Sequence, residues 1–320
     1  IDWDGRELRV TASAGIALYP RDAHGIHELI RFAEQALYEA KRTGRARHRF
    51  FSEAMNAEAS ARLAHEADLR HAIANGQLRL HLQPKVDSLT GRIVGAEALV
   101  RWQHPLRGLV PPADFIPLAE ETGLIVPLTE WVCEQARALL AGWSAAGLQT
   151  VPVSVNVAPP CFMADGLVEQ LETLTTRHGL RPRQLILEVT ESLLMTDVER
   201  AVARLQDLRE SGFGLSLDDF GTGFSSLSYL KRFPIDELKI DRSFVRDVHH
   251  GGKDGALVAS IITLARMLEL RVVAEGVETE AQAGALQMQG CGLHQGYLYS
   301  RPVETQAFEA LLRGPVARRA

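Results

Sequence analysis

The sequence predicts an α/β fold of the (β/α)8 barrel type, and three observations lead to that prediction. After Gly76, short apolar runs alternate with longer amphipathic segments, which is the pattern of repeated βα units around a parallel sheet. Eight such runs occur within roughly 250 residues, which is the number and length expected of a barrel. Polar residues follow nearly every run, as they do where eight loops surround one mouth. An open doubly wound sheet is the alternative.

Composition and charge describe an ordinary globular protein with room for a sizeable core. The chain has 320 residues, of which 46% are hydrophobic and 23% are charged. The formal net charge of -5 gives no general reason to bind a DNA or RNA polymer, so an anionic substrate must be held by local cations and metal. The three isolated cysteines lack the C-x-x-C spacing of zinc sites and are predicted to be reduced. No apolar run approaches the roughly 18 residues of a membrane span, so we expect a cytoplasmic segment, with any upstream sensor or membrane segment outside this chain.

The first 51 residues predict one strand and one helix. Residues 8–17 alternate between apolar and polar side chains and are followed by Pro20, as at the end of a strand. Apolar residues between Leu29 and Ala40 lie at helical spacing, and Gly44 is a natural stop. One strand and one helix cannot bury a core of their own. Residues 1–51 are therefore interpreted as the end of a domain.

A connecting helix is predicted over residues 52–76, where the sequence is rich in Ala, Glu and Arg and shows helical periodicity. The main domain, residues 77–314, then carries the eight strand-like runs. They are Leu78–Gln83, Ile93–Trp102, Val151–Val157, Leu185–Val189, Gly214–Leu217, Glu237–Ile240, Arg271–Ala274 and a final run near Gly296–Tyr299. Helical patterns lie between most of them, at Leu128–Ala145, Leu167–His178, Val198–Ser211, Leu257–Leu268 and Thr279–Gln289.

Acidic and amide side chains recur at the ends of these runs. A single carboxylate there is common, because Glu and Asp often stand where a strand meets water. Several from separate strands indicate one convergent site lined by oxygen atoms. Such a site suits a hard divalent cation such as magnesium or manganese, which prefers oxygen ligands to thiolate or imidazole. The six candidate ligands are Glu97, Asn156, Glu188, Asp218, Asp219 and Glu275.

The adjacent aspartates Asp218 and Asp219 stand before a Gly-rich turn and are the sharpest local signal. Neighbouring carboxylates can coordinate two ions that share one ligand, and paired ions about 3.5–4 Å apart activate water in phosphodiester cleavage. The alternative is an acidic turn that only begins a helix. The equivalent positions of Asn156 and Glu188 favour the two-ion site. Gly221 and Gly223 supply either unusual backbone angles or a mobile loop.

Three further charged residues each keep more than one interpretation. Glu191 lies in the loop after Glu188, where it either braces neighbouring backbone or only stabilises a helix N-terminus. Lys239 is a polar residue between apolar ones, so it either offsets carboxylate repulsion and orients water or faces solvent on an edge strand. Glu275 is a metal ligand, a base toward bound water, or a helix cap.

Gln83 and Arg101 are candidates for substrate contacts, because Arg can clamp a phosphate with two hydrogen bonds. An Arg that only packs over the barrel end is the alternative. The histidines are too scattered for a recognisable metal spacing. Signature motifs of acyl transfer, nucleoside triphosphate hydrolysis and dinucleotide binding are absent from the sequence.

Several motifs resemble those of the EAL family of cyclic-di-GMP phosphodiesterases and stand in the same order along the chain. The resemblance runs from about Ala54 to Arg313. The motifs include Leu82-Gln83-Pro84-Lys85, Glu97-Ala98-Leu99-Val100-Arg101-Trp102, Val155-Asn156-Val157, Glu188-Val189-Thr190-Glu191-Ser192, Asp218-Asp219-Phe220-Gly221-Thr222-Gly223, Leu238-Lys239-Ile240-Asp241, Ala274-Glu275-Gly276-Val277-Glu278 and Gln295-Gly296-Tyr297. This resemblance implies a modified barrel with an atypical first strand. It also implies a homodimer formed through the barrel, and two Mg²⁺ or Mn²⁺ ions that serve to linearise cyclic di-GMP to pGpG.

The same resemblance implies a role for each matching residue. Glu97, Asn156, Glu188 and Asp218 would bind the first ion, and Asp218 would bridge to a second ion held by Asp219. Lys239 would orient the water, Glu275 would be ligand or general base, and Gln295 would complete the site. Glu191 and Glu278 would hold the loop after Asp218. Phe224 stands where the family often has Tyr, a mild change that removes no ligand.

The first 50 residues resemble the C-terminal end of a GGDEF diguanylate cyclase domain. The matching segments are Val10-Thr11-Ala12-Ser13-Ala14-Gly15-Ile16-Ala17 and Ala36-Leu37-Tyr38-Glu39-Ala40-Lys41, while the GGDEF hairpin is absent from the sequence. Two other functions compete with the phosphodiesterase: a receptor that binds cyclic di-GMP with little or no turnover, and an enolase-like barrel enzyme. The intact ligand set argues against the first, and the order of motifs argues against the second.

Overall fold

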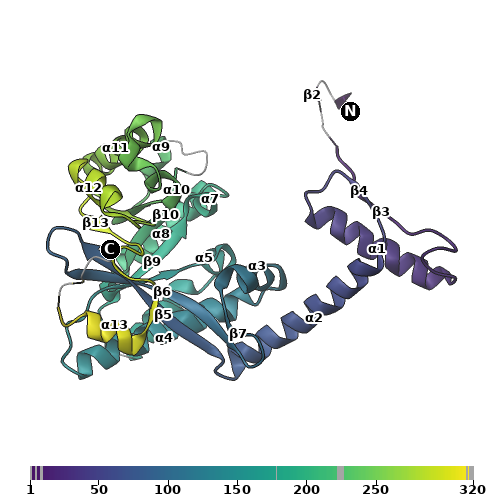
Figure 1. Ribbon diagram of the computed structural model, residues 1–320, viewed down its shortest axis with the longest axis horizontal. Helices are drawn as coiled ribbons and strands as arrows, with labels where there is room; N and C mark the ends of the chain where they lie inside the picture. The colour runs from purple at the N-terminus through teal and green to yellow at the C-terminus, as the bar shows by residue number, and fades with distance from the viewer. Residues whose placement is uncertain are drawn as a thin grey trace. The chain divides into compact units, whose positions relative to one another are not determined.

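A computed structural model describes residues 2–3, 6–7, 10–177, 179–221, 227–314 and 316 of the chain. The chain divides into two compact units, Ile1–His71 and Ala72–Ala320. Figure 1 shows both units and labels many of their helices and strands. The candidate site lies in the second unit.

The first unit is a small α/β arrangement. Two strands, β1 (Asp2–Trp3) and β2 (Arg6–Glu7), pair antiparallel, while β3 (Ala14–Ile16) and β4 (His48–Phe50) pair parallel. Helix α1 (Ile26–Arg42) lies where the helical spacing predicts it, and α2 (Glu53–Ala74) follows β4. A Cβ atom on Gly15 would collide with the α1 backbone at Ala33 and Leu37, so glycine lets α1 approach β3 closely.

The second unit contains a closed barrel of eight strands. Around the barrel the order is β5, β13, β12, β11, β10, β9, β8 and β6, and β6 pairs back with β5. Neighbours from β6 through β13 run parallel, whereas β5 is antiparallel to both of its partners. The predicted (β/α)8 barrel with an atypical first strand is thus confirmed, and the open sheet is wrong. The barrel strands are β5 (Leu78–Asp87), β6 (Ile93–His104), β8 (Val153–Asn156), β9 (Leu185–Thr190), β10 (Gly214–Phe220), β11 (Glu237–Ile240), β12 (Arg271–Ala274) and β13 (Leu293–His294).

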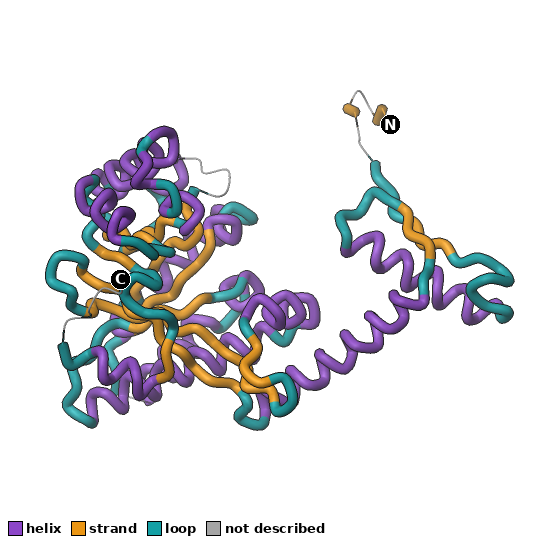
Figure 2. The backbone as a smooth tube through the Cα atoms, in the orientation of Figure 1, coloured by secondary structure: helices purple, strands orange, loops and turns teal. Residues whose placement is uncertain are grey.

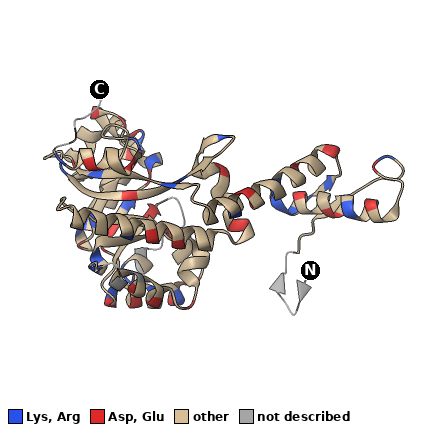
Figure 3. Cartoon of the chain, turned by 90° about the horizontal axis from the view of Figure 1, so that it is seen from below, with Lys and Arg blue, Asp and Glu red and all other residues tan. Residues whose placement is uncertain are grey.

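Helices cover the outside of this barrel, as Figure 2 shows by colour. Two short strands, β7 (Gly108–Val110) and β14 (Val303–Glu304), extend the sheet beside β6 and β5. Figure 3 shows residues of both charge signs along the helices. None of the helices in the described ranges has the length and apolar character that a membrane span requires. The helices are α3 (Pro112–Thr122), α4 (Ile125–Ala145), α5 (Pro159–Met163), α6 (Leu167–Arg177), α7 (Glu191–Leu194), α8 (Val198–Glu210), α9 (Leu227–Leu230), α10 (Arg242–Val245), α11 (Gly252–Met267), α12 (Glu280–Met288) and α13 (Thr305–Leu311), with 3-10 turns at η1 (Pro182–Gln184) and η2 (Val248–His250).

The eighth strand differs from its predicted position. Strand β13 is Leu293–His294, whereas the predicted run near 296–299 forms a turn in which the amides of Tyr299 and Ser300 both donate to the carbonyl of Gly296. Leu298 and Tyr299 are buried, but not in a strand. A short buried apolar run does not distinguish a strand from a packed turn by its periodicity, which explains the error.

Inside the barrel, inward side chains two residues apart on one strand form two successive layers. We call the layer at the carboxyl ends of the parallel strands the upper layer and the next one the lower layer. The upper layer contains Gln83, Glu97, Asn156, Asp218 and Lys239. The lower layer contains Lys85, Gly95, Ser154, Ser216 and Glu237.

Candidate active site

The ammonium group of Lys239 lies at the centre of the carboxylates that the sequence predicts to converge. Its Nζ atom is 2.6 Å from Glu275 Oε1, 2.7 Å from Glu188 Oε2, 3.3 Å from Asp218 Oδ2 and 3.4 Å from Glu97 Oε2. Lys239 is 1% exposed, so the interpretation as a solvent-facing lysine on an edge strand is wrong. Each residue of this group comes from a different strand or strand end. Closure of the barrel brings these strand ends together at one mouth.

Amide side chains complete the upper layer beside Glu97. Asn156 Nδ2 donates to Glu97 Oε1 at 2.8 Å, and Gln295 Nε2 donates to Glu97 Oε2 at 2.6 Å. Gln295 Nε2 also donates to Gln83 Oε1 at 3.0 Å, while Gln83 Nε2 donates to the carbonyl of Ser300 at 3.2 Å. Gln295 Oε1 is buried and has no hydrogen-bond partner among the described residues. An acceptor in this state is an oxygen left for a ligand or a water.

A cavity of about 220 Å³ opens at this group. Its lining includes Arg242 and Tyr297, neither of which stands out in the sequence as a site residue. Arg301 lies over the ring of Tyr297, with its guanidinium carbon 4.2 Å from the ring centroid. Arg101, a predicted substrate contact, is not among the lining residues, and its Nη1 donates to its neighbour's carbonyl, Val100 O, at 2.8 Å. The lining residues that the sequence did single out are Gln83, Glu97, Asp218, Lys239, Glu275, Glu278 and Gln295.

A larger hollow of about 980 Å³ lies at the opposite end of the barrel, where the strands begin. Its walls carry exposed basic side chains such as Arg181 and Arg209, and none of the predicted site residues. The predicted site residues therefore gather at the smaller cavity.

Burial and crowding of negative charge set the ionisation of the carboxylates. Burial raises the pKa of Glu275 to about 8 and that of Asp218 to about 6; Lys239 opposes the rise, but burial together with the neighbouring carboxylates outweighs it. Burial acts in the same direction on Glu188, but Lys239 and Lys85 outweigh it and lower the pKa of Glu188 to about 2. Without a further cation, Glu275 is therefore mostly protonated at neutral pH.

These shifts predict how the stability of the metal-free protein depends on pH. Asp218 and Glu275 bind protons more tightly in the folded state than in the unfolded state, so the free energy of unfolding falls as pH rises from the ordinary carboxylate range to about 8. A divalent cation bound among these carboxylates offsets their negative charge, so it should reduce the dependence of the free energy of unfolding on pH. Urea unfolding from pH 4.5 to 8, in chelator and in Mn²⁺, measures both slopes, and parallel curves would contradict the prediction.

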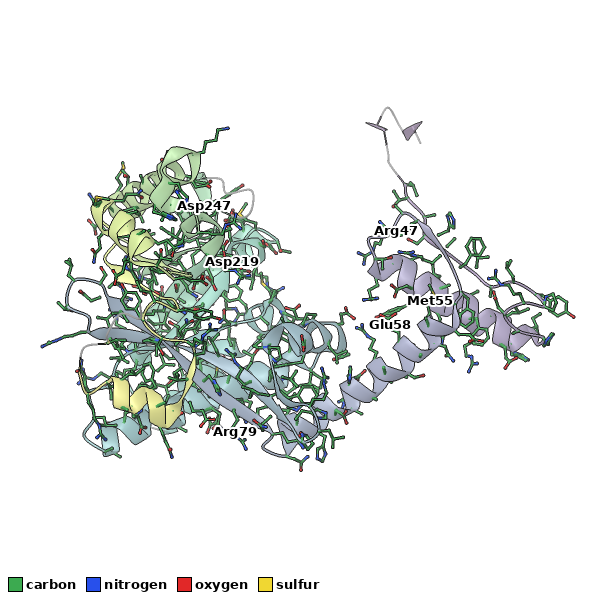
Figure 4. The ribbon with its side chains drawn as sticks, viewed as in Figure 1. Arg47, Met55, Glu58, Arg79, Asp219 and Asp247 are labelled. Carbon is green, nitrogen blue, oxygen red and sulfur yellow. The ribbon has the colours of Figure 1, made fainter. Side chains whose placement is uncertain are left out.

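The second aspartate stands on an irregular backbone. Asp219 has φ of 55°, and the pairing between β10 and β11 shifts register between Leu217 and Phe220. A left-handed conformation is uncommon outside glycine, although Asp adopts it more readily than most residues. Asp218 Oδ1 accepts a hydrogen bond from the Asp219 amide at 2.9 Å. This bulge turns Asp219, labelled in Figure 4, out to an exposed position next to the buried Asp218.

Glu191 reaches the loop that follows. Its Oε2 accepts a hydrogen bond from the amide of Gly221 at 3.0 Å, and Glu191 is 3% exposed at the start of α7. Glu278 is exposed at the rim of the cavity, and its backbone amide donates to Gln282 Oε1 at 2.8 Å. The predicted loop residues Thr222, Gly223 and Phe224 lie outside the described residues.

Glu191→Ala is expected to lower kcat and to raise the Mn²⁺ concentration needed for half activity. The change leaves the half-buried amide of Gly221 without this acceptor, which costs about 1 kcal/mol locally. Asp219 is two residues away and would lose its fixed position, while the first-ion ligands keep theirs. Manganese titrations of the wild type, Glu191→Ala and the exposed-carboxylate control Glu199→Ala measure the effect. Superimposable curves with equal kcat would show that Glu191 is only a helix-end charge.

The mouth suits hard divalent cations by the chemistry of its donors. Its predicted ligands supply carboxylate and amide oxygens, and the described cysteines are buried elsewhere as free thiols. In the part of the chain that the structure describes, no three His, Cys, Asp or Glu side chains are gathered closely enough to hold an ion, and Lys239 lies among the carboxylates of the mouth. The mouth has more carboxylates than this one ammonium group can balance, as the raised pKa values of Asp218 and Glu275 indicate. An added cation would balance the remaining negative charge, so these residues fit one.

Comparison with known proteins places the chain in a family. Residues 66–302 match the EAL domain family. The chain belongs to the EAL family. Residues 1–47 match the diguanylate cyclase GGDEF domain family, which confirms the resemblance seen at the N-terminus.

Two relatives from Pseudomonas aeruginosa show how far the EAL similarity extends. The bifunctional diguanylate cyclase/cyclic di-GMP phosphodiesterase MucR is 47% identical over 300 residues, which are 94% of this chain and 44% of MucR. The cyclic di-GMP phosphodiesterase NbdA is 43% identical over 310 residues, which are 97% of this chain and 40% of NbdA. The chain therefore spans less than half the length of either EAL relative.

Solved EAL structures have the same fold. The PaMucR phosphodiesterase in complex with c-di-GMP matches with a TM-score of 0.74 and 46% identity, over 77% of this chain and 99% of the solved one. The EAL enzyme Bd1971, bound to cAMP and cyclic-di-GMP, matches with a TM-score of 0.76 and 32% identity, over 91% of this chain and 77% of the solved one.

Proposed function

We propose that this chain hydrolyses cyclic di-GMP to linear pGpG with the help of two divalent cations, Mg²⁺ or Mn²⁺. The observation that carries the proposal is the mouth of an EAL barrel in which no predicted ligand is replaced and four carboxylates surround one buried lysine. The relatives named as cyclic di-GMP phosphodiesterases support the choice of substrate.

Six side chains would hold the two ions. Those assigned to the first ion are Glu97, Asn156, Glu188 and Asp218, with Glu275 as a further ligand or as the base. Asp219 would hold the second ion, with Asp218 shared between them. When bound, paired ions of this kind polarise the attacking water and stabilise charge on the leaving oxygen. The exposed, bulged position of Asp219 beside Asp218 is consistent with one aspartate for each ion.

In the proposed reaction, Lys239 supplies a positive charge that orients the water and Glu275 accepts a proton. In the reaction, the oxygen of a water bonds to one phosphorus, the bond from that phosphorus to O3′ breaks, O3′ takes up a proton from solvent, and the ring opens to a linear dinucleotide. Glu275 is close enough to the cavity to accept the proton of the water, and its side chain is 19% exposed. Lys239 stays charged, since the surrounding carboxylates outweigh its burial and raise its pKa, so it can orient the water from the floor of the cavity.

The rim of the cavity supplies contacts for the nucleotide. Gln295 offers a buried oxygen without a partner, and Arg242 offers a cation for a phosphate. Tyr297, 42% exposed and stacked beneath Arg301, offers a flat surface for a base. Gln83 is held by Gln295 and the Ser300 carbonyl at the same rim, and Arg101 remains a proposed contact through movement of its side chain.

One assay tests the proposed function. Purified protein is incubated with cyclic di-GMP and Mn²⁺, and the products are separated by chromatography. We expect pGpG, no turnover in excess chelator, recovery with Mg²⁺ or Mn²⁺, and little support by Ca²⁺, whose longer bonds and looser coordination misplace the water. Full activity in chelator would exclude the two-ion reaction. Binding of intact cyclic di-GMP without cleavage would make the chain a receptor instead.

We assign residues 1–51 to a GGDEF remnant, 52–76 to a connecting helix and 77–314 to the phosphodiesterase barrel, which the two family matches support. We also propose a homodimer formed through the barrel, as the EAL resemblance implies. Sedimentation analysis over a range of protein concentrations tests the dimer.

A further inference from the structure

The lower layer of the barrel holds an ion pair that the proposed reaction does not use. Barrel interiors of this fold are usually filled by bulky apolar side chains. Here Lys85 and Glu237 face each other, with Nζ to Oε1 at 2.6 Å, and they are 3% and 2% exposed. Charged groups buried this deeply are unfavourable unless they are paired and hydrogen-bonded.

Lys85 uses all three of its ammonium hydrogens. Its Nζ contacts Ser154 Oγ at 2.8 Å, Glu188 Oε1 at 2.9 Å and Glu237 Oε1 at 2.6 Å. One of these acceptors, Glu188, is a proposed metal ligand. Lys85 therefore contacts Glu188, which also accepts a hydrogen bond from Lys239 of the upper layer.

Glu188 is held from both sides by the two lysines. Lys85 binds its Oε1 from the lower layer, and Lys239 binds its Oε2 at 2.7 Å from the upper layer. Because each oxygen has a separate ammonium partner, the plane of the carboxylate is fixed, and Oε2 is the oxygen turned toward the mouth. Lys85 is absent from the lining of the cavity, so it would influence the reaction only through Glu188.

Stability alone gives no reason for this ion pair. Replacing both partners of a buried pair by apolar side chains of similar volume is often neutral or stabilising, whereas removing one partner is costly. Glu237 is also satisfied in other ways, since Ser216 Oγ donates to its Oε1 at 3.2 Å and Arg271 Nη2 lies 3.6 Å from its Oε2. The contact that remains unexplained by packing is the one from Lys85 to Glu188.

We propose that Lys85 is a positioning residue for this site: paired with Glu237, it fixes the carboxylate of Glu188 so that one oxygen is presented to the metal and Lys239. The inference rests on the proposed function for its effect on turnover, but its effect on ion binding does not depend on the substrate. Glu237 has the supporting role of fixing the ammonium group of Lys85, so that Lys85 does not move upward into the carboxylates of the mouth.

The test removes the pair while keeping its volume. In the double variant Lys85→Met with Glu237→Met, both charges of the pair are removed together and Glu188 keeps Lys239 as a partner, so the melting temperature should stay close to that of the wild type. We expect Mn²⁺ affinity, measured by electron paramagnetic resonance without nucleotide, to fall about 10- to 100-fold, as for other residues that orient a ligand. We expect kcat to fall as well, with KM for cyclic di-GMP little changed because Lys85 does not line the cavity.

Arg271→Met is the matched control. Arg271 touches Glu237 from the opposite side and is half-exposed, so its loss leaves the Lys85 contact in place. We expect Mn²⁺ affinity within about twofold of the wild type for this variant, well below the effect of a ligand-orienting residue. Unchanged Mn²⁺ affinity in the double variant, or an equal change in Arg271→Met, would overturn the proposal.

A second variant covers the case in which the double variant does not fold. Ser154→Ala removes one acceptor of Lys85 without adding volume or charge, and it should shift Mn²⁺ affinity in the same direction by a smaller factor. No shift in this variant would then count against the proposal. If the wild type binds Mn²⁺ but does not cleave cyclic di-GMP, the proposed function fails while the role of Lys85 toward Glu188 is still measured by ion binding.

Discussion

Lys239→Met is expected to lower the rate of cyclic di-GMP hydrolysis about a hundredfold to a thousandfold, as loss of a positioned donor does in other enzymes. Its Nζ atom touches four carboxylates, at distances from 2.6 to 3.4 Å. Without it, the water in the cavity loses its proposed donor and the carboxylates lose a permanent counter-charge. Steady-state product formation in saturating Mn²⁺ measures the effect, with the exposed Lys231→Met as control.

The same variant should also be destabilised when no metal is present. Removing one partner of a buried ion cluster costs about 3–5 kcal/mol, because the remaining charges stay buried without compensation. Bound ions take over part of this charge balance, so Mn²⁺ should raise the free energy of unfolding more in Lys239→Met than in the wild type. Urea unfolding in chelator and in Mn²⁺ measures both differences. Equal stability of the two proteins in chelator would show that the carboxylates do not depend on Lys239.

Glu275→Gln is expected to lower kcat by about 10²- to 10⁴-fold, the range for loss of a general base. Glutamine keeps the volume of the side chain but accepts no proton from water. Lys239 keeps its contacts with Glu188 and Asp218, so the rest of the mouth should stay in place. The affinity for cyclic di-GMP, measured by calorimetry under conditions without turnover, should change much less than kcat.

The ratio of these two effects separates the possible roles of Glu275. A fall in nucleotide affinity as large as the fall in kcat would indicate a structural or ligand role rather than a base. A rise in the Mn²⁺ requirement with unchanged maximal kcat would identify Glu275 as a metal ligand alone. Glu280→Gln is the control, because Glu280 begins α12 a few residues away and does not line the cavity.

The sequence by itself determined the architecture and which carboxylates gather at the mouth. Alternating strand and helix patterns predict the barrel, because the periods of two and 3.6 residues are local properties of the chain. The carboxyl ends of parallel strands meet at one mouth, so Glu97, Glu188 and Asp218 could be placed together without coordinates. The same local patterns failed at 296–299, where Leu298 and Tyr299 are buried by a turn rather than by a strand.

Only the tertiary structure decided how charge is distributed within the barrel. The pattern of a strand shows which face a side chain takes, but not which residues of other strands lie at the same height. That height is set by register and closure, through pairings such as Lys85 with Gly95 and Ser216 with Glu237. Lys85 shows the same signal as Lys239, a lysine within a buried strand, yet its contact with Glu188 spans 103 positions of the chain.

At Arg101 the sequence predicts a site residue that the structure does not place at the cavity. The cause is again that the sequence does not show which side chains lie together across the barrel. Its place in the Glu97-Ala98-Leu99-Val100-Arg101 motif favours a substrate contact, but in the structure Arg242 lines the cavity and Arg101 does not. Long flexible side chains reach several ångströms in directions that backbone periodicity does not fix. The sequence therefore shows the residue types and the strand ends. The partners of each charged side chain depend on distances across a closed barrel.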